Sequence, residues 1–251
     1  MKKLMDCAMD IGEQMLLCGA EVHRVEDSLN RICHAFGAVR ADVFIITSSM
    51  VLTVHGEDGC IHTQTRRIQS LGTDFHKLDR LNRLSRRICS QGMSLEEIRA
   101  ELESIKTAKS YPFWAECLAY ATISGSFTLF FGGDWRQFLV SVLIGIILRF
   151  VVLLSDQTAG NPVFSKFLSS FLLTAAAFLF VRIGVIPSAD KVIIGNIMLL
   201  IPGIGFTNAL RDLFMGDSIA GALRLMEAVL LAVALAAGYF LFVLAAGGVA
   251  V

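Results

Sequence analysis

The stretch "PGIGFTNALRDLFMGD", residues 202–217, decides how the second half of this chain is read. It follows the apolar run "KVIIGNIMLLI" and is itself followed by a longer apolar run. Pro202 removes a backbone hydrogen-bond donor, and Gly203 and Gly205 weaken any helix around it. The stretch therefore predicts a broken helix between two apolar segments.

The polar residues after this break support two interpretations. In the first, a broken helix lines a transport site, because irregular backbone at membrane depth is tolerated only where protein or water satisfies it. In the second, a kinked helix end leads into an ordinary interfacial loop. Arg211 and Asp212 are then merely solvated, and Asp217 caps the next helix. The residues alone leave both interpretations open.

The charges divide the chain into two domains. The protein has 251 residues, 55% of them hydrophobic, and only seven of its 22 Lys and Arg residues lie beyond residue 110. All five His residues also lie before that point. We expect a polar α+β domain over residues 1–112 and a membrane domain over residues 113–251.

The second domain contains five apolar segments long enough to cross a bilayer, which takes about 20 residues. The predicted fold is an α-helical multi-pass membrane protein whose five spans follow a helix-plus-β-hairpin domain. The short loops carry a small excess of Lys and Arg on the side of the first domain, which favours a cytoplasmic position for that domain. The expected location is the bacterial inner (plasma) membrane, in contact with lipid. The predicted spans are about 113–131, 135–154, 163–183, 190–208 and 218–246.

The first domain shows helix and strand signals in turn. Apolar residues recur at helical spacing from Val22 to Phe36, and Gly37 supplies a stop. A β-branched stretch is interrupted by the turn "GEDG", which predicts a hairpin or small sheet. A second amphipathic helix follows, and Ser94 with Glu97 forms a capping box for a last helix.

Several functional classes lack sequence support. The formal net charge is zero, so no basic excess is available for nucleic-acid binding. The six Cys residues show no CxxC spacing, which favours free thiols in a reducing cytoplasm over a metal site. No HExxH, GxSxG or phosphate loop occurs, and no His lies in the membrane half. We therefore expect no enzyme, no cofactor and no metal.

Two further groups of polar residues have alternative roles. Arg149 lies inside a predicted span, where it either faces a polar pathway or extends to the headgroups. His23, Arg24, Glu26 and Asp27 could form a ligand site, but on a helix with an apolar opposite face they are more typical of a solvated surface.

Three stretches carry a resemblance to a known family. They are "GAEVHRVEDSLNRICHAFGA", "LFFGGDW" and "VIIGNIMLLIPGIGFTNALRDLFMGDSIAGALRLMEA". Together they resemble the threonine/serine exporter family, in particular its N-terminal subunit type. The resemblance implies a cytoplasmic domain before about five spans, efflux of threonine and serine or of succinate-like dicarboxylates, and a smaller membrane partner. It also implies importance for Pro202, Gly203, Thr207, Asn208, Arg211, Asp212, Gly216, Asp217, Arg224 and Glu227.

Side-chain chemistry suggests roles for some of these residues. Arg211 offers a planar fork suited to a substrate carboxylate, and Asn208 could add a neutral hydrogen bond. Asp212 or Glu227 could carry a coupling proton, although Arg224 lies three residues before Glu227 and could pair with it.

The leading hypothesis is thus a subunit of a proton-coupled secondary exporter. The competing hypothesis is an accessory or regulatory membrane protein whose soluble domain binds a partner or a metabolite. The sequence leaves the substrate and the oligomeric state open.

Overall fold

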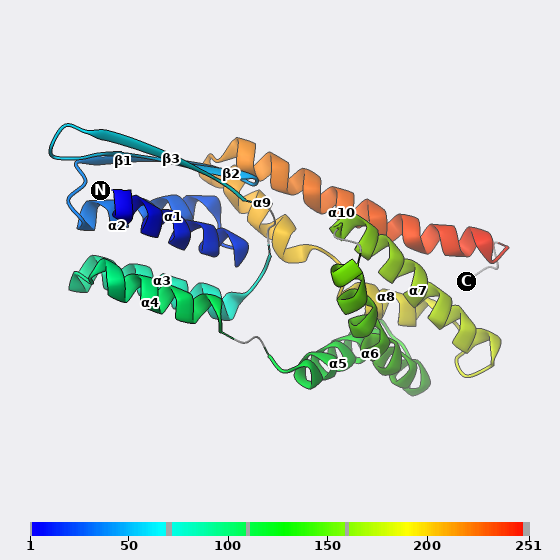
Figure 1. Cartoon of the computed structure of the whole chain (residues 1–251). Helices are drawn as coiled ribbons and strands as arrows, with labels where there is room; N and C mark the ends of the chain where they lie inside the picture. The colour runs from blue at the N-terminus through cyan, green and yellow to red at the C-terminus, as the bar shows by residue number, and fades with distance from the viewer. Residues whose placement is uncertain (1, 69–71, 109–110, 159–160, 248–251) are drawn as a thin grey trace. The chain divides into compact units, whose positions relative to one another are not determined.

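The computed structural model describes residues 2–68, 72–108, 111–158 and 161–247 (Figure 1). The chain forms two compact units. The first consists of Met1–Lys109 with Ile204–Met226, and the second of Ser110–Gly203 with Glu227–Val251. The sequence assigned residues 204–226 to the membrane domain, whereas here they pack with the N-terminal residues.

Four helices and three strands form the N-terminal part of the first unit. The helices are α1 (Lys2–Leu17), α2 (Val22–Ala35), α3 (Phe75–Gln91) and α4 (Leu95–Lys106). In Figure 1, α1 and α2 lie between the sheet and the pair formed by α3 and α4. Their facing apolar residues form one core, in which Leu29, Leu52 and Leu84 are fully buried. Burial of these faces holds the three layers together.

The sheet is an antiparallel meander of β1 (Arg40–Ile46), β2 (Ser49–His55) and β3 (Ile61–Arg67). The predicted hairpin is its β2–β3 half, with the "GEDG" turn between the two strands. Met50, Leu52 and Val54 alternate along β2 and are all buried. One face of the sheet therefore covers the helices.

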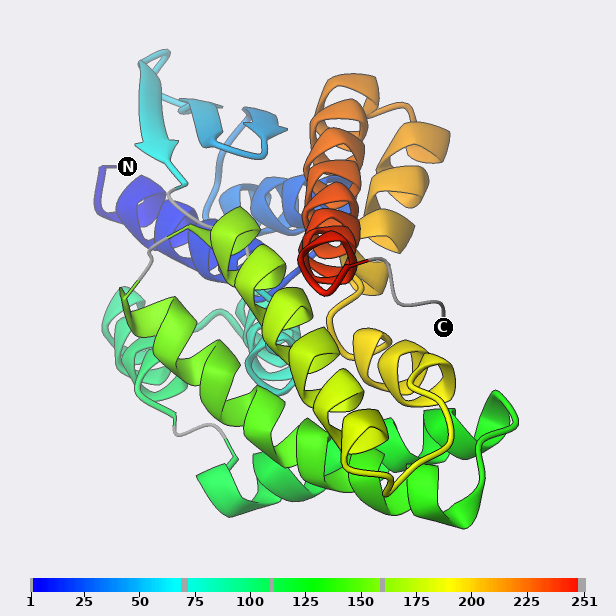
Figure 2. The same cartoon turned by 90° about the vertical axis from the view of Figure 1, so that its right-hand side faces the viewer.

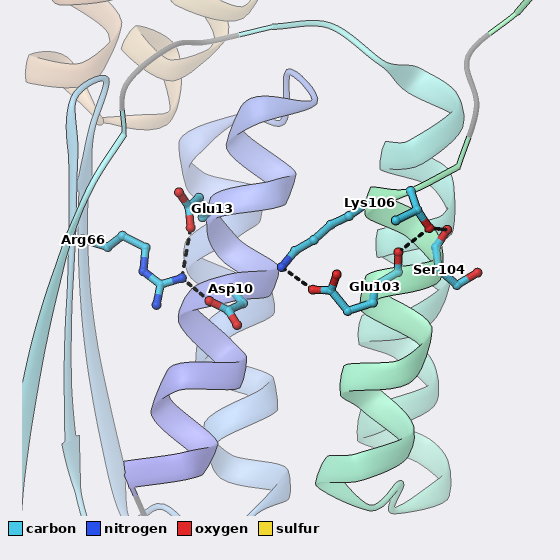
Figure 3. A network of polar contacts seen from close by, with 7 residues as sticks. Asp10, Glu13, Arg66, Glu103, Ser104 and Lys106 are labelled. Atoms are coloured by element: carbon cyan, nitrogen blue, oxygen red, sulfur yellow. Dashed lines mark hydrogen bonds and ion pairs between the residues drawn. The ribbon is translucent and has the colours of Figure 1, made fainter.

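A charged contact attaches the sheet to α1 (Figure 3). Arg66 of β3 forms an ion pair with Asp10 and places Nη1 3.0 Å from Oε2 of Glu13, both on α1. On α4, Lys106 Nζ lies 2.8 Å from Glu103 Oε1. The predicted capping box of α4 is also present, with Ser94 and Glu97 bonded to each other's backbone N–H.

Helices are the only regular secondary structure among the described residues of the second unit. The unit contains α5 (Phe113–Phe130), α6 (Trp135–Thr158), α7 (Pro162–Arg182) and α8 (Asp190–Ile197). Helix α9 (Gly203–Met215) follows, and α10 (Ser218–Ala245) begins in the first unit and continues in the second. Helix α8 packs against α5, α6 and α7.

Among the described residues, three helices are long and apolar enough to cross a membrane. They are the Trp135–Ser155 part of α6, then α7 and α10. Five spans therefore remain a prediction. The predicted fourth span, residues 190–208, is not one continuous helix: α8 has eight residues, about 12 Å of helix, which is less than half of a hydrocarbon core of about 30 Å.

The chain leaves the helical conformation between Ile197 and Gly203, around Pro202 (Figure 2, between the yellow and orange helices). Gly203 is the first residue of α9, and Gly205 lies inside that helix. Gly205 therefore does not break the helix, contrary to the sequence prediction.

Close helix contacts in the second unit depend on small residues. A Cβ added to Gly195 of α8 would lie 2.2 Å from Thr128 Oγ1 of α5. Thr128 in turn lies 2.6 Å from Ser141 Oγ of α6, and both side chains are fully buried. The three helices thus meet where small side chains allow their backbones to approach.

Candidate functional site

The candidate site lies where α9 and the start of α10 meet the loop before α2. All of its residues belong to the first unit. We use the term polar cluster for Glu21, Glu26, Asn208, Arg211, Asp212, Asp217 and Arg224.

Helix α9 presents three polar side chains on one face. Asn208, Arg211 and Asp212 are spaced i, i+3 and i+4, so they project from the same side of the helix. Asn208 Nδ2 donates to the carbonyl oxygen of Gly19 at 3.1 Å, and Arg211 forms an ion pair with Glu21. The face therefore bonds directly to the loop that leads into α2.

Asp212 forms a hydrogen bond at the N-terminus of α2, although it is 190 residues away in sequence. Its Oδ1 accepts from the backbone N–H of Val22 at 3.3 Å. Glu21, at the N-cap position, makes no side-chain cap of its own. A carboxylate at this place satisfies an unpaired N–H group and lies at the positive end of the helix dipole.

Arg224 of α10 completes the buried part of the cluster. Its Nη1 lies 3.1 Å from Oδ2 of Asp212, and its Nη2 donates to the Ala20 carbonyl at 3.0 Å. The side chains of Arg224 and Asp212 are only 6% and 1% exposed. Burial raises the pKa of Asp212 above its ordinary value, and the charge of Arg224 opposes this shift. The suggested pairing of Arg224 with Glu227 is not what the structure has: Arg224 pairs with Asp212.

The turn between α9 and α10 and helix α2 each add one acidic group, Asp217 and Glu26. Gly216 has a φ of 99°, which glycine tolerates and other residues avoid. The next residue, Asp217, carries a buried Oδ2 that has no hydrogen-bond partner in the described residues. Burial, followed by the negative charge of Asp217, raises the pKa of Glu26 to about 7, although the Ile45 N–H donates to Glu26 at 3.2 Å.

The remaining predicted site residues lie apart from the polar cluster. Arg149 of α6 belongs to the second unit, where its Nε lies 2.8 Å from Oε2 of Glu116 on α5. Its guanidinium also lies 5.4 Å from the centre of the Phe113 ring. Glu227 and Thr207 are exposed. No group of His, Cys, Asp and Glu suited to hold a metal occurs among the described residues.

Sequence reasoning missed Glu21 and favoured a solvated surface over a ligand site for Glu26. Glu21 and Glu26 lie in the stretch "GAEVHRVEDSLNRICHAFGA", where the charges read as a solvated surface. The available signal was that this stretch and "TNALRDLFMGD" both carry the family resemblance. Two stretches that mark one family, and that each hold charges of both signs, are candidates for direct contact.

Three helices of membrane-spanning length in the described part of the chain indicate a multi-pass helical membrane protein. Its family follows from comparison with known sequences. The model of the family described as "Putative threonine/serine exporter" matches residues 6–246. The chain belongs to this family, which confirms the resemblance.

Individual relatives carry different names. "Pheromone-regulated membrane protein 10" of Kluyveromyces lactis is 26% identical, over 86% of this chain and 23% of that protein. "Probable succinate transporter subunit YjjP" of Klebsiella aerogenes is 23% identical, over 89% of this chain and 86% of that protein. "Probable threonine/serine exporter" of Mycobacterium tuberculosis is 24% identical, over 94% and 45%. The chain thus spans less than half of the yeast and mycobacterial proteins. No solved structure matches it.

Proposed function

We propose that this chain is a subunit of a secondary exporter for small carboxylate-bearing metabolites. Family membership supports export, and the names of the relatives supply the candidate substrates threonine, serine and succinate. The relative named as a transporter subunit is covered over 86% of its length, which favours a system that needs a second, smaller membrane protein.

The proposed arrangement is that of a bacterial plasma-membrane protein. Five spans cross the bilayer, and the N-terminal domain lies in the cytoplasm. The proton gradient drives export.

The observation that carries the proposal is the interruption between α8 and α9 in a chain of this family. Broken helices place backbone groups and side chains at transport sites in many secondary transporters. On the helix that follows the break, Arg211 is 56% exposed although it pairs with Glu21. An exposed guanidinium fork that already holds a carboxylate suits a substrate carboxylate. In this proposal the substrate displaces Glu21 from Arg211, and Asn208 lies one turn away.

One observation favours the alternative, an accessory or regulatory membrane protein. Asn208, Asp212 and Arg224 all contact the loop of residues 19–22, so the polar side chains after the break hold the N-terminal domain. If these side chains only hold the N-terminal domain in place, their contacts are explained without any substrate.

Reconstitution separates the two functions. The purified chain is placed in liposomes with and without the proposed smaller membrane partner. Efflux of labelled threonine, serine and succinate is measured with an imposed proton gradient and after its collapse. The exporter proposal expects gradient-dependent efflux of at least one substrate when both subunits are present. Equal leakage from these and from empty liposomes would support the accessory function.

A further inference from the structure

We propose that the cleft between α2 and α3 binds a small ligand that carries a phosphate group. This site belongs to the first unit and lies outside the polar cluster, so the inference goes beyond the proposed export. It reverses the interpretation of Arg24 and Asp27 as merely solvated surface.

The cleft has a volume of about 570 Å³ and two helical walls. Arg24, Asp27, Ser28 and Arg31 recur along one face of α2, at i, i+3, i+4 and i+7. The α3 wall repeats this spacing and adds one residue. A volume in this range suits a small metabolite rather than a single water molecule. The α3 residues are Asn82, Ser85, Arg86, Cys89 and Ser90.

The charges along the cleft favour an anion. Three guanidinium groups line it against one carboxylate, that of Asp27, which is paired with Arg31 at 2.9 Å. Arg24 donates its Nε to the neutral amide oxygen of Asn82 at 3.1 Å. Within the described residues, neither Arg24 nor Arg86 has a carboxylate partner. Two forks therefore remain available for an oxyanion.

The walls also supply hydroxyl groups. Ser28 and Ser85 lie at the edge of the α2–α3 contact and are only 9% and 6% exposed. Ser28 donates to the carbonyl of Arg24 at 2.8 Å. A phosphate group accepts several hydrogen bonds at once, so the combination of guanidinium forks with Ser85 and Ser90 fits it better than an isolated charge would.

Cys89 reports on occupancy because it lines the cleft and is exposed. Replacing the accessible Cys60 and the half-buried Cys117 by Ser leaves Cys89 as the one exposed thiol of the described residues. The full chain is reconstituted in phosphatidylcholine vesicles, and the rate of Cys89 alkylation by a maleimide is followed. Inorganic phosphate or glycerol phosphate is compared with chloride at equal ionic strength.

At saturating phosphate we expect alkylation of Cys89 to slow about tenfold, by simple occupancy. Arg24→Gln or Arg86→Gln is expected to weaken the apparent affinity about tenfold, since each removes a charge-assisted contact. Arg83→Gln is the matched control: Arg83 lies on α3, pairs with Asp79 and does not line the cleft. It should leave the protection unchanged.

Two results would overturn the proposal. One is an equal alkylation rate in phosphate and chloride, both in phosphatidylcholine vesicles and in vesicles that also contain phosphatidic acid. The other is protection that survives both cleft substitutions. Protection by soluble glycerol phosphate identifies a free metabolite as the ligand, whereas protection only by phosphatidic acid identifies a lipid headgroup. Cys60, tested in a Cys89→Ser chain, should not respond to either.

Discussion

Asp212 makes more structural contacts than the sequence suggests for a charge after a helix break. It joins the start of α2 to α10, because one oxygen accepts from the Val22 N–H and the other faces Arg224. A carboxylate that is 1% exposed has little access to solvent or substrate. Arg211, one position earlier, is 56% exposed and pairs with Glu21. Adjacent charges thus divide into a structural one and an accessible one.

The Asp212→Asn substitution should strongly destabilise the first unit. It leaves the Arg224 guanidinium buried without a counter-charge, a change of about 3–5 kcal/mol in the free energy of unfolding. The rate at which buried Cys18 reacts with a thiol reagent reports this opening. Asp79→Asn removes the exposed pair with Arg83 and should cost less than about 1 kcal/mol. Equal Cys18 reactivity in the two variants would show that the buried pair does not stabilise the unit.

Glu26 should make stability depend on pH. Its pKa is about 7 in the folded protein against an ordinary 4.5, so the folded state holds the proton more tightly. The resulting contribution is complete below pH 4.5 and is lost as pH rises to 7 and beyond. The ionised form then faces Asp217 and Asp212, with His23 as the opposing charge.

The test compares Glu26→Gln with wild type at pH 5 and pH 8. The variant should gain about 1–3 kcal/mol relative to wild type at the higher pH and about nothing at the lower one. Its neighbour Asp27, exposed on the same helix, provides the control substitution Asp27→Asn. A pH-independent difference would mean that Glu26 does not titrate in this range.

At the scale of elements, the chain around residue 202 contains two short helices where one span was expected. Helix α8 ends at Ile197, and α9 begins at Gly203, so the interruption covers about one and a half turns. The sequence could predict this interruption, because Pro202 removes a backbone hydrogen-bond donor at its own position. It could not predict that α9 packs with the N-terminal residues, because that contact joins distant parts of the chain.

Two glycines of this region should respond oppositely to alanine. Gly216 has a φ of 99°, so Gly216→Ala should destabilise the α9–α10 turn by about 1–2 kcal/mol. Gly205 lies inside α9 with nothing within 4 Å of an added Cβ. Gly205→Ala should therefore stabilise that helix by about 0.5–1 kcal/mol. Thermal unfolding of both variants checks this, and destabilisation by Gly205→Ala would restore Gly205 as part of the helix break.

At the scale of the whole molecule, the sequence could predict more about the elements than about their partners. Helix ends, the Ser94 capping box and the apolar stripe of α2 follow from residues close together in the chain, and the structure has them. The contact of Asp212 with Val22 joins residues 190 apart, and no local pattern encodes it. The contacts within the polar cluster therefore could not be predicted from the sequence. Five of its seven residues were nevertheless site candidates from the sequence.

At this scale the central question is whether Arg211 binds substrate or only pairs with Glu21. The two roles can be separated by exchanging the charges of Arg211 and Glu21, which restores the ion pair but not a positive charge on α9. In the chain with Arg211→Glu and Glu21→Arg, the ion pair is rebuilt with its charges exchanged. A carboxylate substrate, however, meets a negative charge on α9 in place of the guanidinium.

The most direct test is therefore efflux of serine, threonine and succinate from liposomes that contain the partner subunit and either wild-type protein or one of three variants. These are Arg211→Ala, the reversed double variant and the exposed control Arg83→Ala. We expect wild-type efflux from the control. We expect at least about a tenfold loss from both Arg211 variants at equal protein abundance, because a charge-assisted carboxylate contact is absent from each. Recovery of wild-type efflux by the reversed pair would contradict substrate binding by Arg211.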